Sequence, residues 1–446
     1  MKRLHTVWFI AILFLVAATG SVAVARTTHG TTWRTVRVAL RRAPKHTTVT
    51  TLAPTTTSDA PTTTTPTTAS PPTTVPPRET TPTTAIPTPT TTPTVVATGC
   101  KGTPMPSGQA DIDANPQGTT FCMSGTHNWT LTPKSGDTLA GPATLDGANS
   151  ASYAVVAASG VNNVTLSGLE IRNYIGGNAI GAIHAPDPPS STGWTLDDLQ
   201  VHDIGNGTTS GAGAELGVGW HVVGGRYFNT RQEGLTAGSG AHDIVVDSAE
   251  LDHNNFTNDA YTTRSHSCGD EAGGFKLVAD NVTIKNTSVH DNACKGLWTD
   301  INSNGTVITN NLVYNNWDEG IFLEISSNAT VSGNTVYGNG WHNYNGGGSG
   351  CPWLFGGGIS LNSSDHVNIF NNNVYGNCNG ITGVQQDRPD GRPGLLEYVS
   401  VHDNMVAGPA GTSGAAEDNG ANLSTRSITF ASDGFANGMN FCALSC

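Results

Sequence analysis

The sequence predicts an all-β protein folded as a parallel β-helix, and two observations support this prediction. From Leu235 onward, one short phrase keeps returning: a glycine, an alternating strand, a polar turn, a second strand and an asparagine. Where no loop intervenes, the glycines that open consecutive copies lie 22 to 24 residues apart. These glycines are Gly234, Gly274, Gly296, Gly320, Gly358 and Gly380. A unit of this length cannot bury an apolar face alone, so each copy must stack on its neighbours as one coil.

The strand that follows each glycine has one inward and one outward face. The copies at 296–300 and 320–324 read GLWTD and GIFLE. Because strand side chains alternate between faces, the first and third positions after the glycine point inward and the second and fourth point outward. Across the copies the inward residues are Leu, Ile, Phe, Ala or Thr, which suits a narrow stacked core.

Each copy closes with a second strand and an asparagine. The second strands end on the inward aliphatic residues Leu251, Val289, Val313, Val336, Val374 and Val401. Three residues later come Asn254, Asn292, Asn316, Asn339, Asn377 and Asn404. Stacked asparagines one coil apart can hydrogen-bond along the axis as a ladder. We therefore interpret these asparagines as structural.

We also expect a cap at each end of the helix. Residues 111–147 would begin the helix, and the tail after residue 405 would close it.

The first 98 residues form three segments outside the repeat. Residues 1–25 hold two basic residues and then an apolar run that ends in Ala-Val-Ala, the layout of a secretory signal. The run is also long enough for an uncleaved membrane anchor, but the basic residues of segment 26–45 disfavour an anchor with its bulk outside. Residues 46–98 are almost entirely Thr, Pro, Ala and Val, which predicts a disordered, extended stalk. We therefore expect cleavage and an extracellular monomer with its folded domain at 99–446. Only if the N-terminal segment stayed uncleaved would the protein contact a membrane.

The charge of the folded domain restricts its partners. Nine of the 21 Lys and Arg and two of the 34 Asp and Glu lie before residue 99, which leaves 12 basic against 32 acidic residues. The resulting formal charge of −20 argues against nucleic acid, since binding its backbone needs clustered Lys and Arg. It also disfavours a polyanionic glycan, unless calcium bridges the two.

All eight cysteines lie in the folded domain, which indicates an oxidising compartment. The entry and exit of one coil are about 4.8 Å apart, which is within reach of a disulfide. Cys268 with Cys294 and Cys351 with Cys378 each bracket one coil, 26 and 27 residues apart. We also predict the pairs Cys100–Cys122 and Cys442–Cys446, one at each end of the domain.

Two long segments, residues 115–141 and 273–326, resemble the secreted right-handed parallel β-helix repeat proteins of the pectin-lyase-like superfamily. The resemblance covers about residues 100–446 and implies a single-stranded, right-handed β-helix. The superfamily contains pectate lyases, polygalacturonases, alginate-active enzymes and phage tailspikes, so the resemblance also implies a glycan as substrate or partner. The signatures that would select a reaction are missing: the Asn-Thr-Asp, Asp-Asp and Gly-His-Gly series of polygalacturonases, the Trp-Ile-Asp-His segment of pectate lyases and the Asp-Pro-His segment of epimerases. A fold alone does not supply a function.

The outward positions of the first strands form two columns, and part of them is unlike a solvated face. The first column reads Glu215, Thr236, Lys276, Trp298, Phe322, Ser360 and Thr382. The second reads Gly238, Val278, Asp300, Glu324, Asn362 and Val384. Large aromatic rings beside carboxylates are typical of a sugar-binding groove. We therefore predict that Trp298 and Phe322 bind substrate as exposed rings, together with Glu215 and Asn362.

Insertions surround the same face. Residues 255–273 and 340–357 both enter just before a first strand, and the second of these insertions carries Trp341 and Trp353. A third loop, 385–397, leaves at the opposite edge and carries Arg388. Long loops on a rigid scaffold are where binding usually takes place, so these three residues are further substrate-binding candidates.

Asp300 and Glu324 are the most specific catalytic candidates in the sequence. One coil apart in the same column, their carboxyl groups are expected roughly 5 Å from each other. Like charges this close either share a proton, as in a retaining glycosidase, or hold a cation such as calcium. In the second case Lys276 would act as the general base of a β-elimination. The alternative is a purely structural role, in which Asp300 and Glu324 form an acidic ladder that Lys276 holds in place.

Two functions follow from these candidates. The first is an extracellular polysaccharide-active enzyme, a hydrolase or lyase, that uses Lys276, Asp300 and Glu324 and needs no cofactor other than, at most, calcium. The second is a non-catalytic surface protein that binds glycan or cell wall. The uneven composition of the outward columns favours the enzyme.

Overall fold

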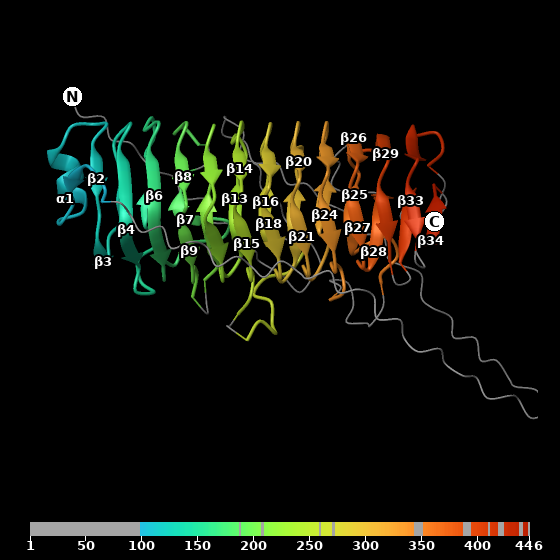
Figure 1. Cartoon of the computed structure of the whole chain (residues 1–446), viewed down its shortest axis with the longest axis horizontal. Coiled ribbons are helices and arrows are strands. Elements are labelled where there is room, and N and C mark those ends of the chain that lie inside the picture. The colour runs from blue at the N-terminus through green and yellow to red at the C-terminus, as the bar shows by residue number, and fades with distance from the viewer. Residues whose placement is uncertain are drawn as a thin grey trace, which may run out of the picture. The chain divides into compact units, whose positions relative to one another are not determined.

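The structure is a computed structural model that describes residues 99–186, 189–206, 209–257, 260–269, 273–342, 351–386, 394–408, 411–417, 423–436 and 440–444. Predictions for residues 1–98, for Arg388 and for Cys446 lie outside these ranges. Within them the chain winds into a stack of coils, with the N-terminal end blue and the C-terminal end red in Figure 1. No helix of the described part is long and apolar enough to span a membrane.

Each regular coil contributes three short strands. The first sheet holds eleven strands: β5 (Val155–Val156), β7 (Gly181–His184), β10 (Ala212–Glu215), β13 (Glu233–Ala237), β16 (Gly273–Leu277), β19 (Lys295–Thr299), β22 (Ile321–Glu324), β25 (Gly357–Asn362), β28 (Asn379–Gln385), β31 (Thr412–Glu417) and β34 (Asn440–Ala443). Strands of successive coils pair in parallel, as predicted.

The rest of each coil forms the second sheet, which has 23 strands. They are β1 (Thr103–Pro104), β2 (Thr120–Cys122), β3 (Gly125–His127), β4 (Thr138–Asp146), β6 (Thr165–Arg172), β8 (Thr195–Asp197), β9 (Gln200–His202), β11 (His221–Val223), β12 (Arg226–Phe228), β14 (Val245–Asp247), β15 (Glu250–Asp252), β17 (Thr283–Lys285), β18 (Ser288–His290), β20 (Val307–Thr309), β21 (Leu312–Tyr314), β23 (Thr330–Ser332), β24 (Thr335–Tyr337), β26 (Asp365–Phe370), β27 (Asn373–Tyr375), β29 (Glu397–His402), β30 (Met405–Ala407), β32 (Ile428–Ala431) and β33 (Gly434–Ala436). The predicted second strand is thus two strands, because the chain bends between them. In the coil of β17 and β18 the bend uses the left-handed conformation of Asn286, at φ 54°, which asparagine tolerates.

The core is a column of inward side chains. The strand register aligns Leu235, Phe275, Leu297, Ile321, Ile359 and Ile381. Each of them is at most 1% exposed. The predicted inward face is therefore confirmed, and the side chains that alternate with it must point out of the stack.

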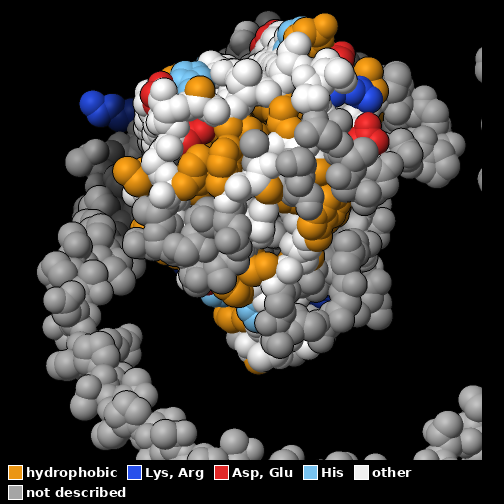
Figure 2. Space-filling view, turned by 90° about the vertical axis from the view of Figure 1, so that its right-hand side faces the viewer, with side chains coloured by type: hydrophobic (Ala, Val, Ile, Leu, Met, Phe, Trp, Pro, Cys, Tyr) orange, Lys and Arg blue, Asp and Glu red, His pale blue; other side chains and the backbone are white. Residues whose placement is uncertain are grey.

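Both ends of the stack are closed. The short helix α1 (Gln109–Ala114) buries Ile112 at the N-terminal end. Figure 2 looks onto the C-terminal end and shows hydrophobic side chains gathered there. In the last coil the rings of Phe435 and Phe441 stack with their centroids 4.4 Å apart. The tail after residue 405 is thus a further coil as well as a cap.

The predicted asparagine ladder is present, but there are two ladders rather than one. Asn254, Asn292, Asn316, Asn339 and Asn377 form the first, with side-chain bonds of 2.8–2.9 Å between neighbours. Asn311, Asn334, Asn372, Asn404 and Asp433 form the second, with bonds of 2.9–3.0 Å.

The assignment of Val401 and Asn404 to the first series was wrong. Val401 pairs with Ile369, and the residue that follows Val374 in register is Val406. Both bends of a coil carry the pattern aliphatic-x-x-Asn, so the sequence signal is the same at each bend and the two series merge.

Removing one member of the first ladder is expected to destabilise the stack. Asn316 donates to Asn339 and to the carbonyl of Val289, and accepts from Asn292. Asn316→Ala leaves these buried groups unpaired, so we expect a loss of about 2 kcal/mol in the free energy of unfolding, measured in urea. Asn373→Ala, at an exposed position of β27, is the matched control. Equal stability of the two variants would contradict a supporting role for the ladder.

Candidate active site

The predicted first outward column is confirmed by the strand register. Glu215, Thr236, Lys276, Trp298, Phe322, Ser360 and Thr382 pair in that order from β10 to β28. In the second column Glu324 pairs with Asn362 and Asn362 with Val384, while Asp300 directly follows β19.

A pocket of about 120 Å³ opens on this face. It is lined by Gly269, Lys295, Trp298, Asp318, Glu319, Phe322, Glu324, Phe355, Asn362 and Gln386. Gly269, Phe355 and Gln386 come from the three insertions, which therefore wall this face as predicted.

Two disulfides tie the wall loops to the coils of the site. Cys268–Cys294 attaches the first loop next to Lys295, and Cys351–Cys378 attaches the second loop next to β28. Cys100–Cys122 forms at the N-terminal end, so three predicted pairs are confirmed. The fourth, Cys442–Cys446, remains a prediction.

Trp298 is almost fully buried. It is 2% exposed, with the ammonium groups of Lys276 and Lys295 3.9 and 4.7 Å from its ring centroid. Its Nε1 donates to Glu324 Oε2 at 3.0 Å. The prediction of an exposed platform is therefore wrong, because the two lysines lie over the ring. Phe322 is also buried, at 5%, and both rings line the pocket.

Asp300 and Glu324 each accept from a donor of the protein. Asp300 Oδ2 lies 3.0 Å from Lys276 Nζ, and its Oδ1 accepts the backbone N–H of Ile301 at 2.7 Å. Glu324 takes the indole N–H and lines the pocket, whereas Asp300 and Lys276 do not line it. Donors of the protein therefore occupy three of the four oxygens of these two carboxylates, which disfavours a calcium ion between them.

Lys295 is a functional candidate that the sequence did not single out. Asp318 and Glu319 are two more, which the sequence places in the turn before Gly320 as ordinary turn acids or as groups that support a site. Lys295 Nζ lies 3.0 Å from Asp318 Oδ2 and 3.6 Å from Glu319 Oε2, and it donates to the carbonyl of Cys268 at 2.6 Å. Lys295 and Glu319 directly precede the repeat glycines Gly296 and Gly320. Both side chains line the pocket.

Burial sets the protonation of this group. It raises the pKa of Glu319 to about 7, helped by the charge of Asp318 and opposed by Lys295. Burial would lower the pKa of Lys295, but the attraction of Asp318 and Glu319 outweighs it and raises that pKa. The pocket thus holds a fixed cation and a carboxyl group that exchanges its proton near neutral pH.

Of the remaining predicted site residues, one lies in the pocket and three lie outside it. Asn362 lines the pocket. Glu215 lies three strands from Trp298 in the same column and pairs with His184 at 2.5 Å. Trp341 and Trp353 are 45% and 39% exposed and do not line the pocket.

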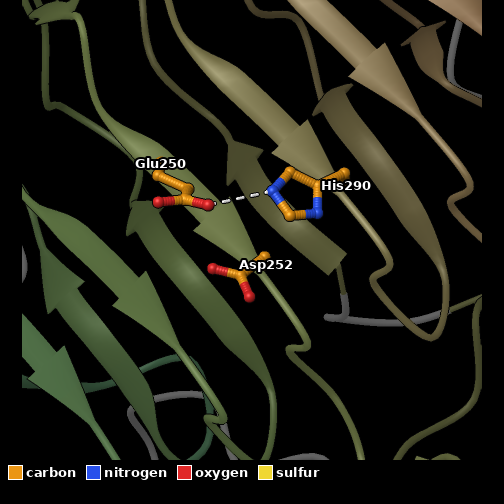
Figure 3. Close-up of side chains that lie close together, drawn as sticks. All are labelled: Glu250, Asp252 and His290. Atoms are coloured by element: carbon orange, nitrogen blue, oxygen red, sulfur yellow. Dashed lines mark hydrogen bonds and ion pairs between the residues drawn. The ribbon is translucent and has the colours of Figure 1, made fainter. Parts of the chain in front are cut away.

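A second titratable cluster lies on the other sheet, where β15 and β18 bring Glu250, Asp252 and His290 together (Figure 3). His290 donates to Glu250 at 3.1 Å. Arg226 binds both oxygens of Asp252, at 2.7 and 2.6 Å. A guanidinium already neutralises the buried carboxylate, so we interpret the cluster as an ion-pair network and not as a metal site.

This network predicts a pH-dependent stability. Burial lowers the pKa of His290, but its bonds to Asp291 and Glu250 outweigh burial and raise it to about 9. Because this value lies above the unfolded value of 6.5, the contribution is complete below pH 6.5 and is lost as the pH rises through 9. Its size is about 2 kcal/mol, since Glu250 and Asp291 are solvent-exposed enough to be screened.

The check compares unfolding of the wild type with that of His290→Phe between pH 6 and 10. Phenylalanine keeps a ring on Tyr314, which stacks on His290 at 4.5 Å. The advantage of the wild type should shrink above pH 8, and a constant difference would contradict the assignment.

Comparison with known proteins supports the fold described above. Residues 190–406 match the family model of the right-handed beta helix region. The fold of the chain is a right-handed parallel β-helix. No curated protein sequence matches this β-helix.

Solved structures of the same fold include enzymes. The A-module of mannuronan C-5 epimerase AlgE4 of Azotobacter vinelandii has a TM-score of 0.52 at 16% identity, over 75% of this β-helix protein and 92% of the module. The AlgE6 A-module of the same organism has a TM-score of 0.46 at 14% identity, over 75% and 94%. Pectate lyase Pel9A has a TM-score of 0.38 at 11% identity, over 67% and 72%. At such identities the likeness shows the fold alone.

Proposed function

We propose that this β-helix is an extracellular polysaccharide-active enzyme that hydrolyses glycosidic bonds in the pocket of the first sheet. One observation carries the proposal: the pocket unites Glu319, whose pKa is near 7, with Glu324, a carboxylate held by an indole N–H. Glycoside hydrolysis needs such a pair, one carboxyl group that gives a proton and one carboxylate that does not.

The residues then take distinct roles. Glu319 gives its proton to the glycosidic oxygen as the bond to the anomeric carbon breaks. Water adds its hydroxyl to that carbon and its remaining proton to Glu324, and this proton later returns to Glu319. Lys295 and Asp318 set the charge around Glu319, while Phe322 and Phe355 offer apolar surface to the sugar.

Lys276 and Asp300, predicted as catalytic, have a positioning role in this proposal. Their ion pair lies against the ring of Trp298, which in turn orients Glu324. Because Lys276 does not line the pocket, the elimination with Lys276 as base is the less supported reaction.

The rival function is glycan or cell-wall binding without cleavage. The exposed rings of Trp341 and Trp353, outside the pocket, favour it because flat aromatic surfaces stack on sugars. Binding through these rings would not depend on the carboxylates.

The test measures reducing ends released from a panel of polysaccharides by the full chain. Glu324→Gln should lower the rate at least 100-fold, because the variant cannot take up the proton of water. Glu397→Gln, the same change at the start of β29 and outside the pocket, is the control and should act like the wild type. Equal turnover by both variants would overturn the proposal, and binding without release would favour the rival.

A further inference from the structure

We infer that the pocket takes an uncharged glycan, without calcium, and not a polyuronate. The inference rests on the proposed function and names the substrate class of the same site. The reason lies in the charges of the pocket and in the contacts of its lysine, Lys295.

The ionisable groups of the pocket lining are predominantly acidic. Asp318, Glu319 and Glu324 face one lysine, Lys295. Even with Glu319 protonated, the described lining has a net negative charge. A uronate residue would bring a further carboxylate into this surface, and like charges in a poorly hydrated site repel each other strongly.

Lys295 is not available to neutralise that carboxylate. Its ammonium contacts Asp318, Glu319 and the carbonyl of Cys268, and it is 5% exposed. It also lies 4.7 Å from the ring centroid of Trp298 and 5.1 Å from that of Phe322. The charge of Lys295 is thus balanced by carboxylates of the protein, and its ammonium group lies near two aromatic rings.

The same lysine occupies the place that calcium would need. A calcium ion requires six to eight oxygen ligands, several of them carboxylate oxygens. Here the nearest carboxylates, those of Asp318 and Glu319, already face an ammonium group. Bridging a uronate through calcium would require that lysine to leave.

In sequence, the parts of the three insertions outside the described ranges add no net positive charge. In sequence, residues 270–272 add two acidic residues, residues 343–350 add none of either sign, and residues 387–393 add two Asp and two Arg. The rest of the lining is uncharged: two phenylalanines, a tryptophan and the amides of Asn362 and Gln386. Amides and apolar rings match the hydroxyl groups and the apolar faces of a neutral sugar.

The experiment compares oligosaccharides that differ only in charge. Hexasaccharides of glucan and glucuronan, of galactan and galacturonan, and of mannan and mannuronan form three pairs matched in linkage and stereochemistry. Their dissociation constants for the full chain are measured by calorimetry, once with calcium and once with chelator. In at least one pair the neutral member should bind at least tenfold more tightly than the uronate, with and without calcium.

A variant tests the cause of the preference. Glu324→Gln removes one pocket charge and should narrow the gap within the pair, whereas Glu397→Gln should leave it unchanged. Equal or tighter binding of the uronate, in either calcium arm, would overturn the inference and leave the proposed function standing. No binding to any member of the three pairs would overturn both.

Discussion

Glu319→Gln is expected to lower kcat by about 10²–10⁴-fold, the range over which a positioned general acid accelerates a reaction. The wild-type rate should fall as the pH rises through about 7, because Glu319 then loses the proton that it must donate. The variant, which has no such proton, should lack this decline. The measurement is kcat between pH 4 and 9 on the polysaccharide that the wild type cleaves.

Stability distinguishes this effect from misfolding. Glutamine can still accept the N–H of Gly356, which Glu319 Oε1 binds at 2.9 Å. Because burial raises the pKa of Glu319 from 4.5, ionising it costs the folded state free energy as the pH rises from 4.5 through 7. At pH 8 the free energy of unfolding of the variant should therefore be no lower than that of the wild type. Lower stability at pH 8, or an unchanged pH profile, would contradict the assignment.

Removing the Cys268–Cys294 disulfide is expected to lower both stability and activity. The bond spans 26 residues, which corresponds to about 3 kcal/mol of lost chain entropy in the unfolded state. Cys268 also supplies the carbonyl that binds Lys295, and Cys294 precedes that lysine. The double variant Cys268→Ser/Cys294→Ser should thus release the first wall loop and disturb the charge around Glu319.

The chain contains a matched control for this variant. Cys100–Cys122 spans 22 residues, so its removal should cost nearly the same stability. It lies at the N-terminal end and not at the pocket, so Cys100→Ser/Cys122→Ser should keep its activity under conditions where both variants are folded. Equal activity of the two double variants would show that the first disulfide has no part in the site.

The sequence predicted the columns well because they follow from periodicity. Alternation and the repeat glycines fix which side chains point outward, so Lys276, Trp298 and Phe322 fall in register as expected. Exposure could not be predicted in the same way. The burial of Trp298 depends on the side chains of Lys276 and Lys295, which lie over its ring.

Lys295 was missed, and Glu319 was assigned to a turn, for a related reason. Acidic and basic residues before a glycine are usual in turns, and only the close approach of the two coils shows that these side chains meet. The register error at Val401 has another origin. Two bends of one coil use the same aliphatic-x-x-Asn pattern, and a pattern that occurs twice per turn cannot say which bend it marks.

The first ladder also shows how such a protein can diversify. Asn254 and Asn292 are separated by 38 residues and Asn292 and Asn316 by 24, yet the two contacts measure 2.9 and 2.8 Å. The contact between neighbouring asparagines is therefore the same in a coil with an insertion and in a coil without one. Exchange of the wall segments between relatives would therefore alter which sugars are accepted while the scaffold beneath stays the same.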